Sequence, residues 1–417
     1  MRLSFADYSV ISTASLTKEV KKLSSYREEV LQKVSDFDES APEFSLVYAA
    51  HPEVEDTLAF VKKEFSSIKH LLLIGIGGSS LGVEAVHSVL NTGKVKLTVL
   101  DTISAHDIEL ALSELATYKK AHDIAVCVVS KSGTTTETLV NASIVLEKLK
   151  KQFGKAIYNQ VIFIGNKSTD FAKQGKKLGA HFIAIPEHVG GRYSVGTAVG
   201  LIPLALLGHD TDSFIEGFLA CHEEDIEEVA AESAARMSLY MQKKYSHYNF
   251  FAFEKRLKTL GAWYRQLFAE SIGKNTDREG KPVTKGFLPT ISTPIELHSI
   301  GQLYLSGFPG VYTDFVTFDD ETIDFKIPKT GLGKQFSRFS AQEVTTAIYG
   351  GVVGAYNDNE LTHRTTIFED ELAYELGLFM AMRMRETMYL AELLNLNAFD
   401  QPSVELYKQK TKKILGL

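Results

Sequence analysis

The sequence has little cysteine, no long apolar run and no excess of positive charge. Its two cysteines, Cys127 and Cys221, are too few for a disulfide framework, and no paired Cys/His spacing indicates structural zinc. We interpret Cys127, which lies in the apolar run IAVCVV, as a buried packing residue. The longest apolar stretch, residues 195–207, contains glycine and Pro203 and is shorter than the ~20 residues that span a bilayer. Disulfide-rich, zinc-stabilised and membrane-spanning classes are therefore disfavoured.

The net charge of −7 argues against a nucleic-acid partner, which would need a basic surface. An anionic substrate would have to be attracted by a local cluster of donors, because the overall field repels it. The first ten residues, MRLSFADYSV, lack the basic start and apolar stretch of a signal peptide, so we expect a cytoplasmic protein. At 44% hydrophobic and 23% charged residues, the composition is that of a folded globular protein.

A chain of 417 residues predicts two domains. Residues 1–50 read as a helical N-terminal segment without a strand. From residue 51 to 190, short apolar runs without alternation are separated by amphipathic segments, which predicts a parallel sheet covered on both faces. The predicted strands of this doubly wound α/β domain are residues 70–76, 96–101, 124–130, 160–165 and 181–185.

The second half of the chain repeats these signals without a strict sequence repeat. Residues 191–245 are predicted to form a helical connector, residues 246–395 a second α/β domain, and residues 396–417 a C-terminal tail. The expected strands of the second domain are residues 249–253, 287–291 and 311–319, and its expected long helices are residues 254–271 and 370–394.

A glycine-rich loop at residues 71–82 (LLLIGIGGSSLG) is the first candidate for ligand binding. Glycine lets the backbone approach a ligand, and the N–H groups at the start of the following helix attract an anion. The loop is not the dinucleotide fingerprint G-x-G-x-x-G, because the sixth position is Ser80. Asp101, at the end of the next strand, could serve a nicotinamide dehydrogenase as a ribose ligand, although a strand-end cap is its more ordinary role.

The loop at residues 130–138 (SKSGTTTET) is a stronger signal. Six of its nine residues carry hydroxyl groups, Lys131 adds a positive charge, and Gly133 frees the turn. Hydroxyl and backbone donors beside a cation are what a phosphate dianion requires. Thr134 and Glu137 have the spacing of a capping box, which accounts for Glu137 but not for the other hydroxyl groups. Both loops follow strands of one parallel sheet, so we expect them to meet at its carboxyl edge.

Two further segments carry residues suited to stabilising or moving charge. Arg192 follows paired glycines in EHVGGRYSVGTAVG (187–200), and it is either directed into a pocket or exposed on a surface loop. Gln266 and Glu270 stand four residues apart in AWYRQLFAESIGK and therefore share one helix face. We expect apolar neighbours to raise the pKa of Glu270, which would suit a general base, although a solvated glutamate is the ordinary alternative.

Two basic residues complete the set. The segment STPIELHSIGQLY (292–304) begins with the pattern of a helix N-terminus, which assigns Glu296 to capping. His298 lies just inside that helix, and taken alone it is more typical of a structural histidine. Lys408 lies on the amphipathic tail FDQPSVELYKQK (399–410), where a lysine is normally exposed to solvent.

Taken in order, these six segments resemble the glucose-6-phosphate isomerase family over nearly the whole span from residue 71 to 410. The family's arginine signature matches in full from Glu187 through Gly200. The Gly-Gly-Ser loop, the Ser-Lys-Ser…Thr-Glu-Thr loop, the Glu-Ser-x-Gly-Lys element and the Phe-Asp-Gln…Val-Glu-x-x-Lys tail all recur. Six independent motifs in one order are very specific, and the chain looks like the short bacterial form of the family.

The resemblance implies two sugar-isomerase-type (SIS) α/β domains with parallel-rich sheets, a C-terminal helical tail and a homodimer with shared active sites. It implies reversible conversion of glucose 6-phosphate and fructose 6-phosphate through an enediolate, in glycolysis and gluconeogenesis, with no cofactor and no metal. It also implies that Glu270 is the base, that Arg192 stabilises the enediolate and that His298 with Lys408 opens the sugar ring. The substrate-binding residues that it implies are Gly78, Ser79, Ser130, Lys131, Ser132, Thr135, Thr138, Gln266 and Gln401.

The sequence departs from the family pattern at two places. Ser403 stands where the tail usually has glycine before its valine, and Ser80 stands where longer enzymes carry aspartate. The chemistry agrees with the resemblance, because an aldose–ketose conversion needs a carboxylate to move the proton and a cation to stabilise the enediolate. Three alternatives stay open: activity also on mannose 6-phosphate, a non-catalytic sugar-phosphate sensor, and a nicotinamide dehydrogenase. The presence of Glu270 and His298 disfavours the sensor, and Ser80 disfavours the dehydrogenase.

Overall fold

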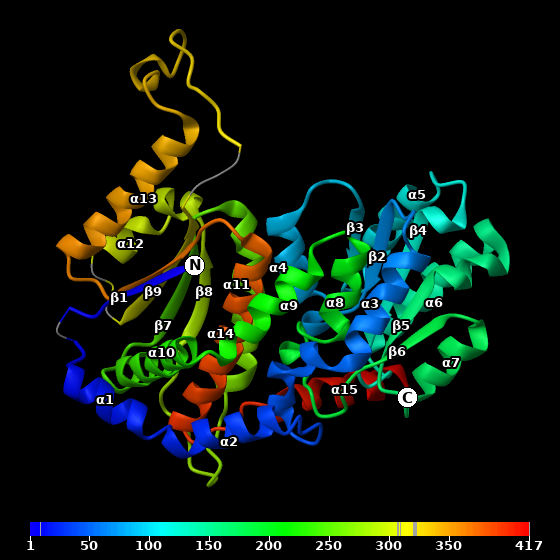
Figure 1. Ribbon diagram of the computed structural model, residues 1–417, viewed down its shortest axis with the longest axis horizontal. Coiled ribbons are helices and arrows are strands. Elements are labelled where there is room, and N and C mark those ends of the chain that lie inside the picture. The colour runs from blue at the N-terminus through cyan, green and yellow to red at the C-terminus, as the bar shows by residue number, and fades with distance from the viewer. Residues whose placement is uncertain (9, 307, 309, 320–322, 417) are drawn as a thin grey trace.

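Two five-stranded sheets lie side by side in the computed structural model, which describes residues 1–8, 10–306, 308, 310–319 and 323–416 (Figure 1). All pairs in the first sheet are parallel, as the continuous apolar runs predict. The central strands β2 and β4 are buried along their whole length. In spatial order the strands are β3 (Lys96–Leu100), β2 (His70–Ile74), β4 (Ile124–Val129), β5 (Val161–Gly165) and β6 (His181–Ala184).

Helices cover both faces of the first sheet because alternate residues of its strands enter two different hydrophobic clusters. Leu71 and Leu73 pack in the larger cluster, whereas Leu72 and Ile74 pack in the other. The larger cluster includes residues of α3 (Pro52–Glu64), α4 (Leu81–Leu90) and α8 (Ala198–Leu206). The other includes residues of α5 (Ala105–Leu115), α6 (Thr136–Phe153) and α7 (Asp170–Leu178). The prediction of a doubly wound α/β arrangement is confirmed.

The second sheet is parallel except at one edge, where β1 pairs antiparallel with β10. In spatial order its strands are β1 (Arg2–Ala6), β10 (His363–Phe368), β9 (Val311–Phe318), β7 (His247–Ala252) and β8 (Leu288–Ser292). One face packs on α10 (Glu224–Gln242), α11 (Lys258–Ile272) and α14 (Leu372–Leu393). The other face packs on α12 (Gly301–Leu305) and α13 (Ala341–Asp358).

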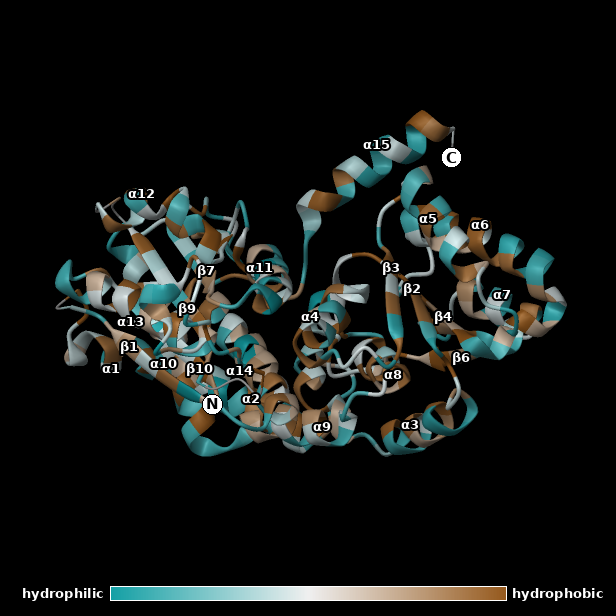
Figure 2. Cartoon of the chain, turned by 90° about the horizontal axis from the view of Figure 1, so that it is seen from above, coloured by the Kyte–Doolittle hydropathy of each residue, from teal (hydrophilic) through white to brown (hydrophobic). Residues whose placement is uncertain are grey.

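The remaining helices join or flank these layers. They are α1 (Thr13–Lys21), α2 (Ser24–Ser35), α9 (Thr211–Leu219) and α15 (Glu405–Leu415). Helix α9 packs along α14, whereas α15 extends from the second sheet's unit towards the first sheet's unit (Figures 1 and 2). Short 3-10 segments are Pro42–Leu46, Tyr48–Ala50, Gly77–Ser79, Ala121–Asp123, Gly154–Gln160, Gly191–Tyr193, Ala220–His222, Lys255–Leu257, Pro294–His298, Lys334–Phe336 and Pro402–Val404. Within the described ranges, no helix has the length and apolar character needed to cross a membrane.

The expectation that residues 1–50 contain no strand is wrong. Residues Arg2–Ala6 form β1, whose pairing register places Phe5 opposite Arg364. The amino group of Met1 holds this edge strand in place, because it donates to Glu375 at 2.8 Å and lies 2.9 Å from Glu369. This short segment forms a strand because it can pair with β10 at the sheet edge and because Glu369 and Glu375 bind the Met1 amino group. Strand β10 is a further element that the sequence pattern does not predict.

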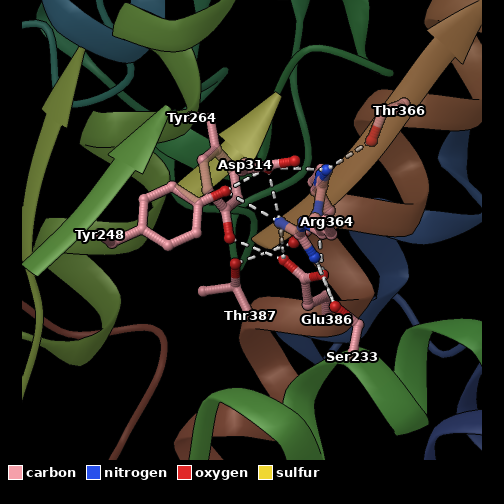
Figure 3. Close-up of polar contacts among 9 residues, drawn as sticks. Ser233, Tyr248, Tyr264, Asp314, Arg364, Thr366, Glu386 and Thr387 are labelled. Carbon is pink, nitrogen blue, oxygen red and sulfur yellow. Dashed lines mark hydrogen bonds and ion pairs between the residues drawn. The ribbon is translucent and has the colours of Figure 1, made fainter. Parts of the chain in front are cut away.

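A fully buried network of charges lies between the second sheet and α14 (Figure 3). Arg364 of β10 and Arg383 of α14 both contact the carboxylates of Asp314 and Glu386. Tyr264 of α11 donates to Glu386 at 2.6 Å, so the network also reaches the helix that carries the predicted base. Its two positive and two negative charges balance within the core.

Candidate active site

Loops at the carboxyl ends of β2 and β4 border a cavity of about 680 Å³. Its lining residues come from both α/β units and from α15, so the chain closes it only when all these parts are folded together. Nine residues of the predicted site line it: Gly78, Ser79, Ser132, Thr135, Arg192, Gln266, Glu270, Gln401 and Lys408. Ser130, Lys131, Thr138 and His298 are not among its described lining residues.

The glycine-rich loop packs directly against the turn that carries Arg192. A Cβ atom on Gly78 would lie 2.2 Å from the carbonyl carbon of Gly191, which no side chain could accept. Gly77 has a φ of +60°, and a Cβ there would lie 2.7 Å from the Nε2 atom of Gln266. These glycines therefore allow the loop to approach both the arginine turn and α11.

The hydroxyl-rich loop ends at the N-terminus of α6, which opens into the cavity. The predicted capping box of Thr134 and Glu137 is wrong: the N-cap residue is Thr135, and among the described side chains none caps the helix there. Ser132, Thr134, Thr135 and Thr136 line the cavity at this point. The first N–H groups of an 18-residue helix thus remain available to an anion beside several hydroxyl groups.

Three further residues of the same loop, Ser130, Lys131 and Thr138, are not in the described lining. Ser130 is buried, donates to the Thr135 hydroxyl at 3.1 Å and accepts from the Gly133 amide at 3.1 Å, so it shapes the loop. Thr138 is buried in the first turn of α6. Partial burial lowers the pKa of Lys131, and the nearby charge of Glu187 opposes that shift.

Arg192 is 3% exposed and its guanidinium has five hydrogen-bond acceptors. It donates through Nε to the Ser271 hydroxyl at 2.8 Å, through Nη1 to Glu270 at 3.2 Å and to Gln401 at 2.8 Å. Through Nη2 it donates to the carbonyl oxygens of Ala398 at 2.6 Å and Asp400 at 3.0 Å. The structure therefore places Arg192 in the site, and the alternative of a surface arginine is excluded.

Glu270 is held between an amide and a guanidinium. Gln266 donates to its Oε1 atom at 3.0 Å, which confirms that the two side chains share a helix face, and Arg192 approaches its Oε2 atom. The apolar surroundings expected for Glu270 are wrong, because its side chain is 35% exposed and faces the cavity. Leu267 and Phe268 are buried on the core side of α11.

The two basic residues differ in position. Lys408 of α15 lines the cavity and pairs with Glu405 at 2.7 Å. His298 is exposed at the end of the 3-10 segment Pro294–His298, outside the cavity lining that the structure describes. The capping role predicted for Glu296 is confirmed, since its carboxylate accepts from Thr293.

Sequence reasoning missed three polar residues that support the site. Ser271 accepts from Arg192 and bonds to the Tyr193 hydroxyl at 2.9 Å. Lys274 and Asp400 form an ion pair at 2.8 Å next to Glu270 and Gln401. Ser271 and Lys274 lie in the segment AWYRQLFAESIGK, and Asp400 lies in FDQPSVELYKQK. Their place in these two motifs is the only signal by which the sequence marks them. Among the described residues, no group of three or more His, Cys, Asp or Glu side chains could hold a metal ion.

The sequence matches the phosphoglucose isomerase family over residues 10–296. The chain belongs to this family. Glucose-6-phosphate isomerase of Clostridium tetani is 31% identical over 386 residues, which are 87% of this chain and 84% of that relative. The same enzyme of Campylobacter jejuni is 27% identical over 416 residues, covering 95% and 97% of the two chains.

Solved structures confirm the fold of this phosphoglucose isomerase family member. A hypothetical protein from Thermus thermophilus superposes with a TM-score of 0.84 at 26% identity, covering 99% of this chain and all of that one (100%). The glucose-6-phosphate isomerase of Chlamydia trachomatis gives a TM-score of 0.79 at 18% identity, covering 99% of this chain and 88% of that one. The family assignment excludes a dehydrogenase as the reading of the glycine-rich loop.

Proposed function

We propose that the chain interconverts glucose 6-phosphate and fructose 6-phosphate. The observation that carries this proposal is that the Glu270 carboxylate, the Arg192 guanidinium and the open N-terminus of α6 share one cavity. The anion site belongs to the first α/β unit and the Glu270 carboxylate to the second. A phosphorylated sugar suits this arrangement, because its phosphate and its reacting carbons lie at opposite ends of the molecule. The names of the relatives, glucose-6-phosphate isomerase, support the same substrate pair.

In this proposal the phosphate binds at residues 132–137 and the sugar extends towards α11. Glu270 removes the proton from one of the two carbons that exchange the carbonyl group and returns it to the other. Arg192 stabilises the negative charge of the enediolate oxygen, and its five acceptors hold it still before that charge develops. Lys408 lines the cavity from α15 and assists ring opening.

A coupled assay tests the proposal directly. Fructose 6-phosphate is added to the purified chain, and glucose 6-phosphate is followed as NADPH through glucose-6-phosphate dehydrogenase. We expect turnover that depends on the chain. Binding of fructose 6-phosphate without turnover would instead identify a non-catalytic sensor, and a parallel reaction with mannose 6-phosphate measures epimer selectivity.

The phosphate loop gives a prediction of its own. Replacing both Ser132 and Thr135 by alanine should raise KM for fructose 6-phosphate, each lost hydrogen bond to a charged group being worth roughly 1.5–3 kcal/mol. Ser143→Ala on the same helix is the matched control, because its exposed hydroxyl donates only to the Leu139 carbonyl among its described contacts. An unchanged KM in the double variant would contradict phosphate binding here.

We further propose that the chain works as a homodimer in which the partner's His298 completes each site. His298 is not among the described residues that line its own chain's cavity, and its segment exposes two large apolar side chains: Ile295 is 71% exposed and Leu303 46%. An arm formed by residues 323–340, before α13, projects from the same unit (Figure 1) and exposes Ile323 and Phe325. A second copy would cover these side chains and bring its own copy of the histidine.

Shared sites predict complementation between two inactive variants. Glu270→Gln and His298→Ala chains, mixed, unfolded and refolded together, should form hybrid dimers in which one of the two sites has both residues intact. Such a mixture should regain a sizeable part of wild-type turnover, whereas each variant refolded alone stays inactive. Sedimentation of the mixture checks that dimers form. Dimers without regained activity would contradict a shared site.

A further inference from the structure

Lys274 contacts three acceptors beside the proposed catalytic groups. It follows Glu270 by one helical turn, and its ammonium group donates to the Glu270 carbonyl oxygen at 2.9 Å. It also bonds to the Asp400 carboxylate at 2.8 Å and to the Asp400 carbonyl oxygen. Its side chain is 8% exposed.

A lysine that only caps the C-terminus of α11 would need the first of these contacts alone. The other two reach the 398–401 segment, which is distant in sequence. Burial lowers the pKa of Lys274 and the Asp400 charge opposes that shift, so the ammonium depends on this carboxylate. The pairing is therefore more than an exposed surface ion pair.

The 398–401 segment is held between two cations. The carbonyl oxygen of Asp400 accepts from both Lys274 and Arg192. Arg192 takes two further acceptors from this segment, the Ala398 carbonyl oxygen and the Gln401 side chain. If Lys274 were removed, the segment would be free to shift, and Arg192 would lose three of its five acceptors together. Its remaining partners would be Ser271 and the Glu270 carboxylate, and a tighter pairing with Arg192 would make that carboxylate a weaker base.

We propose that Lys274 is a positioning residue for the isomerisation: through Asp400 it fixes the 398–401 segment and so holds Arg192 and Gln401 at their distances from Glu270. Lys274 is not among the described residues that line the cavity, so on this arrangement it does not contact the sugar. It acts on the chemical step, because the groups that it positions stabilise the transition state. This inference rests on the proposed function.

Lys274→Met should lower kcat by about 10- to 100-fold, as expected for a displacement of catalytic groups of about 1 Å, with KM nearly unchanged. Lys274→Arg keeps the charge and should recover part of kcat, and Asp400→Asn should lose kcat in the same direction. Lys281→Met is the control, since Lys281 lies on the following loop and pairs with exposed Glu279. Asp400 is half-exposed, so Asp400→Asn should still fold. It therefore tests the same contact if Lys274→Met does not fold.

Wild-type kcat in Lys274→Met or in Asp400→Asn would overturn the proposal, as would a loss confined to KM or no recovery in Lys274→Arg. A crystal structure of Lys274→Met gives a readout that is independent of turnover. It should show the 398–401 segment displaced and the hydrogen bond from Arg192 to the Ala398 carbonyl broken, and an unmoved Arg192 would overturn the positioning role. If the wild-type chain is inactive but the Lys274→Met structure shows the expected displacement, the result would contradict the proposed function and leave the positioning role intact.

Discussion

Replacing Glu270 by glutamine should lower kcat by about 10²–10⁴-fold while fructose 6-phosphate still binds. Glutamine keeps the shape of the side chain, and its amide can still contact Gln266, but it cannot accept a proton from carbon. The phosphate end of the cavity lies on other elements than α11, so the contacts proposed for the phosphate remain. Glu270 is the only carboxylate within hydrogen-bond distance of Arg192 among the described residues.

Solvent exchange separates loss of the base from a general loss of activity. The wild-type chain should wash deuterium out of C2 of labelled glucose 6-phosphate, and Glu270→Gln should not. Glu137→Gln is the control, because it also removes a carboxylate from the cavity but at the phosphate end, away from Arg192. Near-normal turnover in Glu270→Gln, or continued exchange of the deuterium, would show that another group moves the proton.

The strands of the first sheet could be predicted because burial on both faces leaves a continuous apolar run, and β2 and β4 are such runs. The same logic fails for β10. Its sequence, HRTTIF, is mostly polar because Arg364 points into a buried network and the strand pairs with β1. A pattern of apolar residues cannot reveal a strand whose buried side chains are charged.

The residues of the site could also be found from their motifs, but their surroundings could not. The neighbours of Glu270 in sequence are apolar, yet a helix sends Leu267 and Phe268 to its core face and Glu270 to its cavity face. The polar partners of Glu270 and Arg192 come from segments up to 209 residues away, such as Gln401. Contacts over that separation are set by the fold, and local sequence does not record them.

The buried network beneath α11 is another feature that the sequence pattern does not predict, although the run MAMRMRETMYL in α14 contains its signal. Arg383 and Glu386 stand three residues apart in a helix whose side chains are mostly buried, and both are fully buried. A charge in the core is tolerated only when it is paired and hydrogen-bonded. Two arginines on neighbouring elements therefore require two carboxylates, and Asp314 of β9 is the second.

Glu386→Gln should destabilise the chain by about 3–5 kcal/mol, because it leaves Arg364 and Arg383 to share the single carboxylate of Asp314 in the core. Urea unfolding followed by circular dichroism measures the change. Glu279→Gln is the matched control: it breaks an ion pair between two exposed side chains, Glu279 and Lys281, which should cost less than about 1 kcal/mol.

The double variant Arg383→Met, Glu386→Met tests whether charge balance is the cause. It removes one charge of each sign and leaves the Arg364–Asp314 pair. Its loss of unfolding free energy should therefore be smaller than the summed losses of the single variants Arg383→Met and Glu386→Met. If the losses simply add, the cost of Glu386→Gln comes from local packing instead.

The buried network also reaches the proposed base, because Tyr264 joins Glu386 to α11. Glu386→Gln should therefore also loosen the helix that carries Glu270, and kcat should fall while the protein is still folded.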